Sequence, residues 1–469
     1  MPISLLFSRL FAPFRRLVYL TCSNRFTFAG VSSGQHCLLN CLVGCFTPNT
    51  TTHKETSISF MDHKFTQIQG GASAKMTENN VRYAYFPSIE AADRDWSKVA
   101  QLTEDIFFQR SFLYTVEQNP PLGMRFGYLV YYKGENPIGI SVCQIKHFSA
   151  AESIADENEK DPCFFNGLSK WFKRRVSGWA EADILICGNL LATGAHGFWF
   201  NPDLVPLHEM PLLLEKGLQY AAEQSGRNGT KIAMILVKDV LPQTQGVFSS
   251  NFIKKKYTEF EIQPNMVLDL PFADFDGYLN AMSTKYRTRA KRAFKKAESL
   301  QKKELTLLEI QQEADNMYAL YKEVATNAGF NMVDLNEHYM LALHQALNGK
   351  FRVFGYYLNG ELVCYCTTLH NNHELEAHFL GYNKAHNHDY QLYLNMLYDM
   401  IQVAFTSGCK KIVFARTALE IKSSVGAEPE QLLCYLRHQN SLINNLTTTI
   451  LDYLKPVEEW QQRHPFKDN

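Results

Sequence analysis

The sequence has no excess of charge of either sign and few cysteines. Its 47 basic and 47 acidic residues cancel, which argues against a protein that covers nucleic acid or an acidic membrane with its whole surface. Eleven cysteines are too sparse for a disulfide scaffold, so a reducing compartment is expected. No apolar run reaches the roughly 18 residues that a membrane-spanning helix needs. A cytoplasmic protein that meets anionic partners through a local patch is therefore expected.

Length and composition favour a folded protein of more than one domain. The chain has 469 residues, of which 46% are hydrophobic, 13% aromatic and 20% charged. Such a composition is typical of well-packed globular proteins. A chain of this length exceeds the size at which one hydrophobic core usually stops growing, so two or more domains are expected.

The N-terminal segment has an unusual composition. Residues 1–54 contain five basic residues and no acidic one, which is typical of a transit peptide. The alternative is an upstream extension that the working protein lacks, because Met61 and Met76 both precede the first globular stretch. We assign residues 1–75 to a disordered or transit-like extension. A genuine transit peptide would make the location organellar instead of cytoplasmic.

We expect no metal site. Cys37, Cys41 and Cys45 recur every four residues, but this spacing does not match the common iron–sulfur motifs. Five histidines cluster later in the chain without the spacing of a zinc helix or knuckle. These histidines are His370, His373, His378, His386 and His388.

Two similar β-hairpins are predicted in distant parts of the chain. Residues 124–133 and 138–145 are rich in aromatic and β-branched residues and flank turn residues that include Gly134. Residues 351–358 and 361–369 repeat this pattern around Gly360, 226 residues later. Both patterns indicate antiparallel strand pairs.

A strand, a helix and a second strand are expected after each hairpin. The first set comprises residues 182–191, 210–224 and 231–240, and the second comprises residues 374–380, 389–407 and 410–415. The pattern predicts a mixed-sheet α/β fold used twice, as tandem domains packed side by side. We place the first domain at 81–270, the second at 271–455 and a C-terminal tail at 456–469.

The second domain begins with a strongly basic helix. Seven of the twelve residues from 285 to 296 are basic and none is acidic, while an apolar stripe at helical spacing allows the helix to dock on a core. One interpretation is a solvated basic face. The other is an anion-binding helix, because uncompensated like charges repel one another at i, i+4 spacing. The candidate ligands to the anion are Lys285, Arg287, Arg289, Arg292 and Lys296.

Two segments carry a family resemblance. Residues 275–297, FDGYLNAMSTKYRTRAKRAFKKA, and residues 414–440, FARTALEIKSSVGAEPEQLLCYLRHQN, resemble the Fem-like and BioF2-like acyltransferases of the GNAT superfamily. The resemblance is strongest over about 270–455. It implies an acyl or aminoacyl transferase whose splayed central strands hold the donor. The implied co-substrate is acyl-CoA or aminoacyl-tRNA, the acceptor is an amine, and no permanently bound cofactor or oligomeric state is implied.

Candidate catalytic residues lie on the predicted strand 374–382. Glu374, Glu376 and His378 share one face by alternation, with Tyr382 beyond them at the strand end. Amine attack requires a group that accepts the amine's proton, and Glu376 and His378 are the first choices, with Tyr382 as a third. The alternative is that they are ordinary polar residues of a half-exposed strand.

The donor's phosphates need an anchor. Many acetyltransferases have a glycine-rich turn after this strand, whose backbone N–H groups hold a pyrophosphate. Here Gly381 and Asn383 are followed by basic residues and Asp389, so we expect poor acetyl-CoA binding. The first domain's Gly188, Gly194 and Gly197 form either a weak phosphate loop or a flexible turn.

Further substrate contacts are expected after the strand 410–415. Arg416 and Thr417 follow it directly and Lys422 lies shortly beyond, where α/β folds commonly place ligand contacts. A buried ion pair is the competing interpretation of Arg416. Asn383 completes the candidate substrate-binding set.

The active site is expected in the second domain, with the first domain shaping the acceptor cleft. A different class of protein also fits the sequence, namely a non-catalytic module that binds RNA or a phosphorylated ligand through residues 285–296.

Overall fold

The computed structural model describes residues 74–76, 81–149, 181–326, 333–445, 447–448, 451 and 460–467. One compact unit spans Gln69–Asn469. We call residues 74–270 the first half and residues 271–467 the second half. Almost all of the predicted extension 1–75, including Cys37, Cys41 and Cys45, lies outside the described residues.

The first half contains these elements in chain order: β1 (Ala74–Met76), β2 (Val81–Phe86), α3 (Ile89–Thr103), the 3-10 helix η1 (Ile106–Phe108), α4 (Arg110–Gln118), β3 (Met124–Lys133), β4 (Asn136–Ser149), β5 (Glu181–Cys187), β6 (Phe198–Phe200), α7 (Met210–Arg227), β7 (Ile232–Val240), η3 (Pro242–Thr244), α8 (Gln245–Lys254), β8 (Thr258–Glu261) and β9 (Asn265–Asp269).

The second half contains α9 (Phe275–Ala281), α10 (Thr284–Lys296), β10 (Gln301–Glu304), α11 (Leu307–Gln312), α12 (Ala314–Ala325), α13 (Tyr339–Ala346), β11 (Phe351–Leu358), β12 (Glu361–Asn371), β13 (Glu374–Tyr382), α14 (Lys384–Tyr390), α15 (Leu392–Thr406), β14 (Lys411–Val413), α16 (Leu419–Ser423), β15 (Glu428–Glu430), β16 (Leu433–His438) and α17 (Ser441–Asn444).

The two halves repeat one topology, which confirms the predicted α/β fold with a tandem arrangement. The first sheet contains the order β2-β3-β4-β5-β7 and the second the order β10-β11-β12-β13-β14. In both series the first three pairings are antiparallel and the last is parallel. Both predicted hairpins are present, as β3–β4 and β11–β12.

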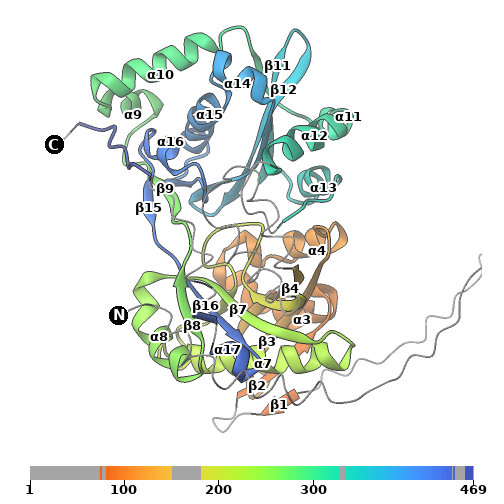
Figure 1. Cartoon of the computed structure of the whole chain (residues 1–469). Coiled ribbons are helices and arrows are strands. Elements are labelled where there is room, and N and C mark those ends of the chain that lie inside the picture. Colours follow the sequence, from red (N-terminus) through yellow and green to blue (C-terminus); the bar gives the residue numbers. More distant parts are fainter. Residues whose placement is uncertain are drawn as a thin grey trace, which may run out of the picture. The chain divides into compact units, whose positions relative to one another are not determined.

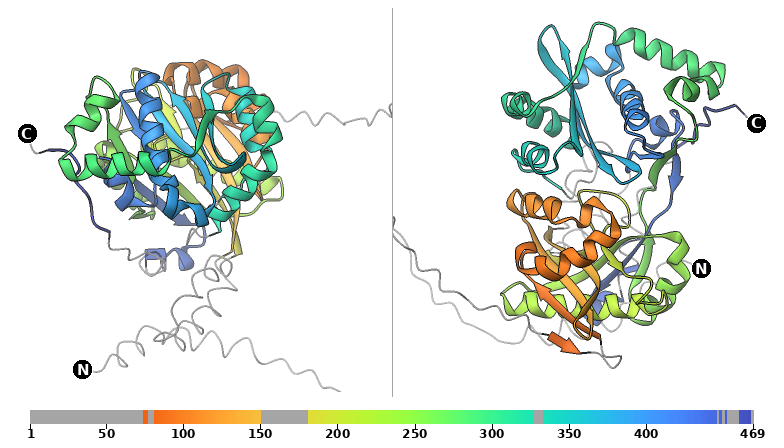
Figure 2. Two further views of the ribbon diagram at one scale, coloured as in Figure 1. Left: turned by 90° about the horizontal axis from the view of Figure 1, so that it is seen from above. Right: turned by 180° about the vertical axis from the view of Figure 1, so that it is seen from behind.

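Each half gives one strand to the other half's sheet. The strand β9 lies between β14 and β15 of the second sheet, while β16 lies between β7 and β8 of the first. The two chain segments that cross, β8 to β9 and β15 to β16, run alongside each other between the sheets (Figures 1 and 2). Strand pairing therefore crosses the predicted boundary at 270/271 in both directions.

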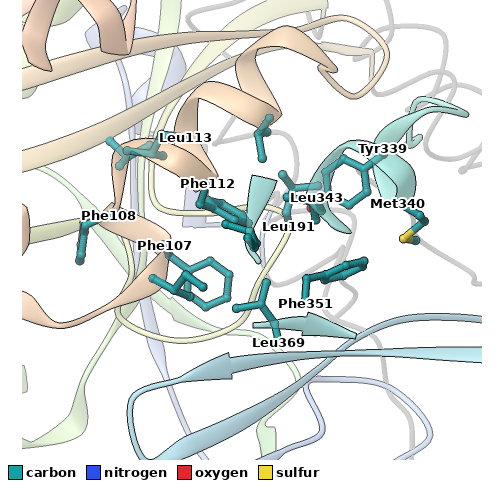
Figure 3. Packing of buried hydrophobic residues seen from close by; sticks show 14 of the residues in the cluster. Phe107, Phe108, Phe112, Leu113, Leu191, Tyr339, Met340, Leu343, Phe351 and Leu369 are labelled. Carbon is teal, nitrogen blue, oxygen red and sulfur yellow. The ribbon is translucent and has the colours of Figure 1, made fainter. Parts of the chain in front are cut away.

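A hydrophobic core joins the two halves. Phe107 and Phe112 of the first half belong to the same buried cluster as Leu343, Phe351 and Leu369 of the second, and none is more than 1% exposed. Figure 3 shows these side chains pointing toward one another from both halves. Full burial of such a side chain contributes about 1.5–3 kcal/mol, so each half depends on the other to cover its apolar face.

Two further clusters cover the outer faces of the sheets. One lies between the first sheet and α7 and α8, and the other lies between the second sheet and α9, α10 and α15. None of the helices in the described part of the chain combines the length and apolarity that a bilayer crossing requires.

Candidate functional site

The strands β13 and β14 form a fork in the second sheet. They pair from Glu374 opposite Lys411 to Glu376 opposite Val413, and the pairing ends there. Directly beyond, β13 contains a bulge, since its register against β12 shifts between Ala377 and Leu380. The Thr367 hydroxyl holds this bulge, because Oγ1 accepts from the Phe379 N–H at 2.9 Å and donates to the Phe379 carbonyl at 2.8 Å.

Glu376 lies at the base of this fork. Glu376 is only 4% exposed. Burial raises the pKa of its carboxyl to about 8. In the described part of the chain it forms no ion pair, since the neighbouring Lys411 pairs with Glu374, although the charges of His196 and Lys411 favour its ionisation. Glu376 is therefore a carboxyl group that can take up or release a proton near neutral pH.

The first half places a histidine close to Glu376. His196 Nδ1 lies 2.7 Å from the carboxylate of Asp105. Burial opposes protonation of the ring, but Asp105 outweighs burial and raises the pKa of His196 to about 9. No sequence signal marks this pair, because Asp105 and His196 are 91 residues apart and belong to no spacing motif.

Asn371 connects this pair to the second sheet. Its Nδ2 lies 3.2 Å from Asp105 Oδ1 and its Oδ1 accepts from the Ile106 N–H at 2.9 Å. Asn371 ends β12, whose residue Leu369 pairs with Glu376. The hydrogen bonds therefore fix Asp105 and His196 relative to the strand that carries Glu376.

The other predicted residues of β13 have different surroundings. His378 lies on the same face as Glu376, but its Nε2 is 2.8 Å from the Tyr339 hydroxyl and its ring contacts Phe351 and Phe379. Burial lowers the pKa of His378 to about 3, so the ring is neutral.

Tyr382, the third candidate, lies on the other face of β13 from Glu376. Its ring packs against Tyr393 in the cluster on the α15 side of the sheet. The bulge adds one residue and so reverses the alternation beyond it. Glu374, at the other end of β13, forms an ion pair of 2.7 Å with Lys411.

The corresponding fork of the first sheet is filled by its own chain. Its last pair is Cys187 opposite Val237, so Cys187 takes the place that Glu376 has in the second sheet. Burial raises the pKa of this thiol well above its usual range. A Cβ on Gly197 would lie 2.8 Å from the Gly188 Cα, and one on Gly188 would lie 2.8 Å from the Lys238 Cβ. This packing favours a turn over a phosphate loop for Gly188 and Gly197, although the turn is close-packed and not the flexible one expected.

Arg416 takes part in a buried charge cluster between the halves. The Asp239 carboxylate, which is fully buried, forms ion pairs with Arg416 and Lys238 and accepts from the Gly194 N–H at 3.0 Å. Burial opposes ionisation of Asp239, but the two cations outweigh it and lower its pKa. Arg416 therefore forms a buried ion pair, which was the competing interpretation of this residue. Lys238 and Asp239, which sequence reasoning missed, lie just before the last residue of β7, a strand whose other residues are all apolar. That change from apolar to charged residues is the signal that could have identified them.

The neighbouring Lys422 is also engaged by the protein. Its Nζ donates to the carbonyls of Ala415 and Arg416 at 3.3 and 2.6 Å, and burial lowers its pKa to about 7. Thr417 is exposed and has a φ of 67°, which a β-branched residue adopts only under strain. Strained residues concentrate at functional sites, so a substrate contact by Thr417 stays a prediction.

The start of α14 is already capped by protein oxygens. The Lys384 N–H donates to Glu323 Oε1 at 2.9 Å and the Ala385 N–H donates to Asn383 Oδ1 at 2.9 Å. Asn383 therefore acts here as a helix cap. A carboxylate stands where a backbone cradle would hold a donor's phosphate, and its negative charge repels one.

Weak binding of CoA is the expected consequence. Calorimetric titration of the full chain should show no tight complex, whereas Glu323→Gln, which removes the repelling charge, should strengthen any binding several-fold. Asp315→Asn is the control, because Asp315 is an exposed carboxylate on the same helix. A tight CoA complex of the unaltered protein would contradict this prediction.

The basic residues 285–296 lie on one helix, α10, as predicted, and a short break separates it from α9. Met282, between α9 and α10, has an extended backbone and bridges to Phe466. Ala290 and Ala293 are buried, as the apolar stripe predicted. The structure does not bring the cations of α10 to Glu376, because α10 packs with α14 and α15 on the opposite side of the second sheet (Figure 1). Anion binding by Lys285, Arg287, Arg289, Arg292 and Lys296 stays a prediction.

Metal binding has no support in the described residues. No group of three or more His, Cys, Asp or Glu side chains in these parts of the chain is placed to hold an ion.

Comparison with known proteins confirms the GNAT resemblance for part of the second half. Residues 284–423 match the family model described as "Acetyltransferase (GNAT) domain". The matched segment begins with α10, ends with α16 and contains Glu376 and the fork. It supports an acyltransferase in general. No curated protein matched the sequence.

Solved structures with similar folds include FemX, a tandem GNAT protein and L-PGS. FemX is 12% identical with a TM-score of 0.45, and the similarity covers 71% of this chain and 96% of that one. A tandem GNAT protein from the clavulanic acid biosynthesis pathway is 10% identical, with a TM-score of 0.43 and coverage of 76% and 99%. L-PGS from Bacillus licheniformis is 10% identical, with a TM-score of 0.39 and coverage of 73% and 96%.

Proposed function

We propose that this protein is an N-acyltransferase that moves an acyl or aminoacyl group from an anionic carrier, acyl-CoA or aminoacyl-tRNA, to an amine. The observation that carries the proposal is Glu376, a buried carboxyl whose pKa is raised to about 8 at the fork of the segment that matches an acetyltransferase domain. Perturbed carboxyls of this kind are typical of general acids and bases.

The reaction can be written with the residues present. The acceptor amine attacks the carbonyl carbon of the donor, so a C–N bond forms as the C–O or C–S bond to the carrier breaks. Glu376 takes the proton that the amine loses and returns it to the departing oxygen or sulfur. The positive charge of His196, held by Asp105, stabilises the Glu376 carboxylate while it is ionised.

The fork offers donors for the carbonyl oxygen. Beyond Glu376, β13 is paired with β12 on one edge, while its pairing with β14 has ended. We propose that backbone N–H groups of β13 on the edge toward β14, where the pairing has ended, meet the negative charge that develops on the oxygen during attack. The first half supplies His196 and Asp105, while among its described residues Cys187 and closely packed glycines occupy its own fork, so we assign the reaction to the second half.

Screening the purified full chain tests this proposal. Acyl-CoAs and aminoacyl-tRNAs should each be incubated with a set of amines, and products detected by mass spectrometry. We expect at least one donor to yield an acylated amine, with loss of product in the Glu376→Gln variant. The alternative function, a module that binds RNA or a phosphorylated ligand without chemistry, is supported if the folded protein yields no product with any donor.

A further inference from the structure

The helix α10 presents a stripe of cations along one side. Lys285, Arg289, Arg292 and Lys296 are all exposed and follow one another at i, i+4, i+7 and i+11, so they share one side of the helix. Lys291 and Lys295 are also exposed but lie on the other flank. In the part of the chain that the structure describes, no carboxylate forms an ion pair with any of these side chains.

The stripe is long enough to contact several successive phosphates of a polymer, and it is longer than a single small ligand. Eleven residues at a rise of 1.5 Å separate Lys285 from Lys296, which gives about 17 Å. One nucleic-acid strand advances about 3.4 Å along the axis per phosphate, so the stripe runs beside about five phosphates. A single diphosphate would engage only one or two of the four cations and leave the others to repel one another.

A membrane surface fits the helix less well. Helices that lie on bilayers insert large apolar side chains opposite their basic face. The apolar residues of α10 instead pack against the second sheet's outer cluster, so they are not free to enter a bilayer; they are Tyr286, Ala290, Ala293 and Phe294. None of the exposed large hydrophobic residues among those described belongs to α9 or α10.

The neighbouring helix α14 adds ring systems beside the stripe. Lys296 Nζ donates to the His388 carbonyl at 3.0 Å, which places α14 on the stripe's side of α10. The His388 side chain is exposed, and the rings of His386 and Tyr390 lie 5.9 Å apart. Unpaired bases stack on such rings. The nearby carboxylate of Asp389 lies 3.1 Å from His388 Nδ1.

From these observations we infer that α10 and α14 form a binding surface for the phosphodiester backbone of a nucleic acid, with RNA as the ligand because α14 offers rings for unpaired bases. This inference goes beyond the proposed function, because binding at α10 requires no reaction at Glu376, which lies on the other side of the sheet. Either statement can fail while the other holds.

The test compares two matched double variants of the full chain. Arg289→Glu with Arg292→Glu alters the stripe, and Lys291→Glu with Lys295→Glu alters the other flank by the same charge. Binding of a fluorescein-labelled, uncharged tRNA transcript is followed by anisotropy between 50 and 200 mM salt. Duplex DNA and phosphatidylglycerol vesicles serve as competing ligands, and circular dichroism verifies folding. Arg289→Gln with Arg292→Gln replaces the stripe variant if the latter does not fold.

The unaltered protein should bind the transcript and lose about a hundredfold in affinity over this salt range, as expected for about four phosphate contacts. The stripe variant should bind at least tenfold more weakly at 50 mM salt, with the salt slope reduced by about two, and the flank variant less than threefold more weakly. Equal losses in both variants, no binding at 50 mM salt, or preference for vesicles or duplex DNA would overturn the inference.

Discussion

Replacing Glu376 by Gln is expected to lower kcat by about 10²–10⁴-fold, because the amine then has no group that accepts its proton. The amide keeps the size and polarity of the side chain, so the fold should be retained. Steady-state kinetics with the donor and acceptor found by screening measures the effect. The matched control is Glu374→Gln, which removes a carboxylate from the same strand that is engaged by Lys411. Full activity of Glu376→Gln, equal to that of the control, would show that Glu376 is not the base.

The pH dependence of the rate provides a second readout of Glu376. Since burial raises its pKa to about 8, the carboxyl is protonated at pH 6 and largely ionised at pH 9. A base must be ionised, so kcat/KM should rise with pH and level off above about 8. This rise should be absent from the residual activity of Glu376→Gln.

The stability of the protein should also depend on the ionisation of Glu376, but it should fall with rising pH where the rate rises. The pKa of Glu376 is about 8 in the folded chain against an ordinary 4.5, so between these values the folded state binds more protons than the unfolded state. The free energy of unfolding therefore falls as pH rises through this window. Glu376→Gln should be more stable than the unaltered protein at pH 8 by about a few kcal/mol, and nearly equal to it at pH 4.5.

Replacing Asp239 by Asn is expected to destabilise the protein by about 3–5 kcal/mol, because it leaves the cations of Lys238 and Arg416 buried without their counter-charge. Asn suits this position sterically, since residue 239 has a φ of 61° and Asn tolerates the left-handed region. The loss is therefore attributable to charge. Urea unfolding monitored by circular dichroism measures it.

The control for Asp239 is an ion pair at the surface. Glu304 pairs with Arg352 at 2.6 Å with its side chain 44% exposed, and such pairs contribute about 1 kcal/mol or less. Glu304→Gln should therefore change stability little. A loss below about 1 kcal/mol for Asp239→Asn would show that the buried cluster does not hold the halves together.

Much of the fold was predictable because local pattern determines it. The strands 124–133 and 351–358 have the predicted bounds, since aromatic and β-branched residues between turn signals favour strands wherever they occur. The repeated order of elements 226 residues apart was equally visible. The exchange of β9 and β16 between the sheets was not predictable, because the local pattern of a strand does not say which of two sheets it joins.

The candidate site was predictable only in part. Glu376 could be selected because alternation places it on one face of the predicted strand 374–382 together with His378. The face on which Tyr382 lies could not be predicted, since one bulge residue reverses the alternation of β13. His378 gave the same sequence signal as Glu376, yet the Tyr339 hydroxyl and surrounding rings account for it as part of the core.

The sequence by itself determined the duplicated α/β pattern, the acid on β13 and the uncompensated charge of α10, because each follows from residues that are neighbours in the chain. Only the tertiary structure decided which charges meet. It placed Asp105 and His196 beside Glu376, paired Asp239 with Arg416 across 177 positions, and put α10 on the side of the sheet away from Glu376. These placements depend on how the two sheets exchange strands and pack through one core. No local sequence pattern encodes that packing.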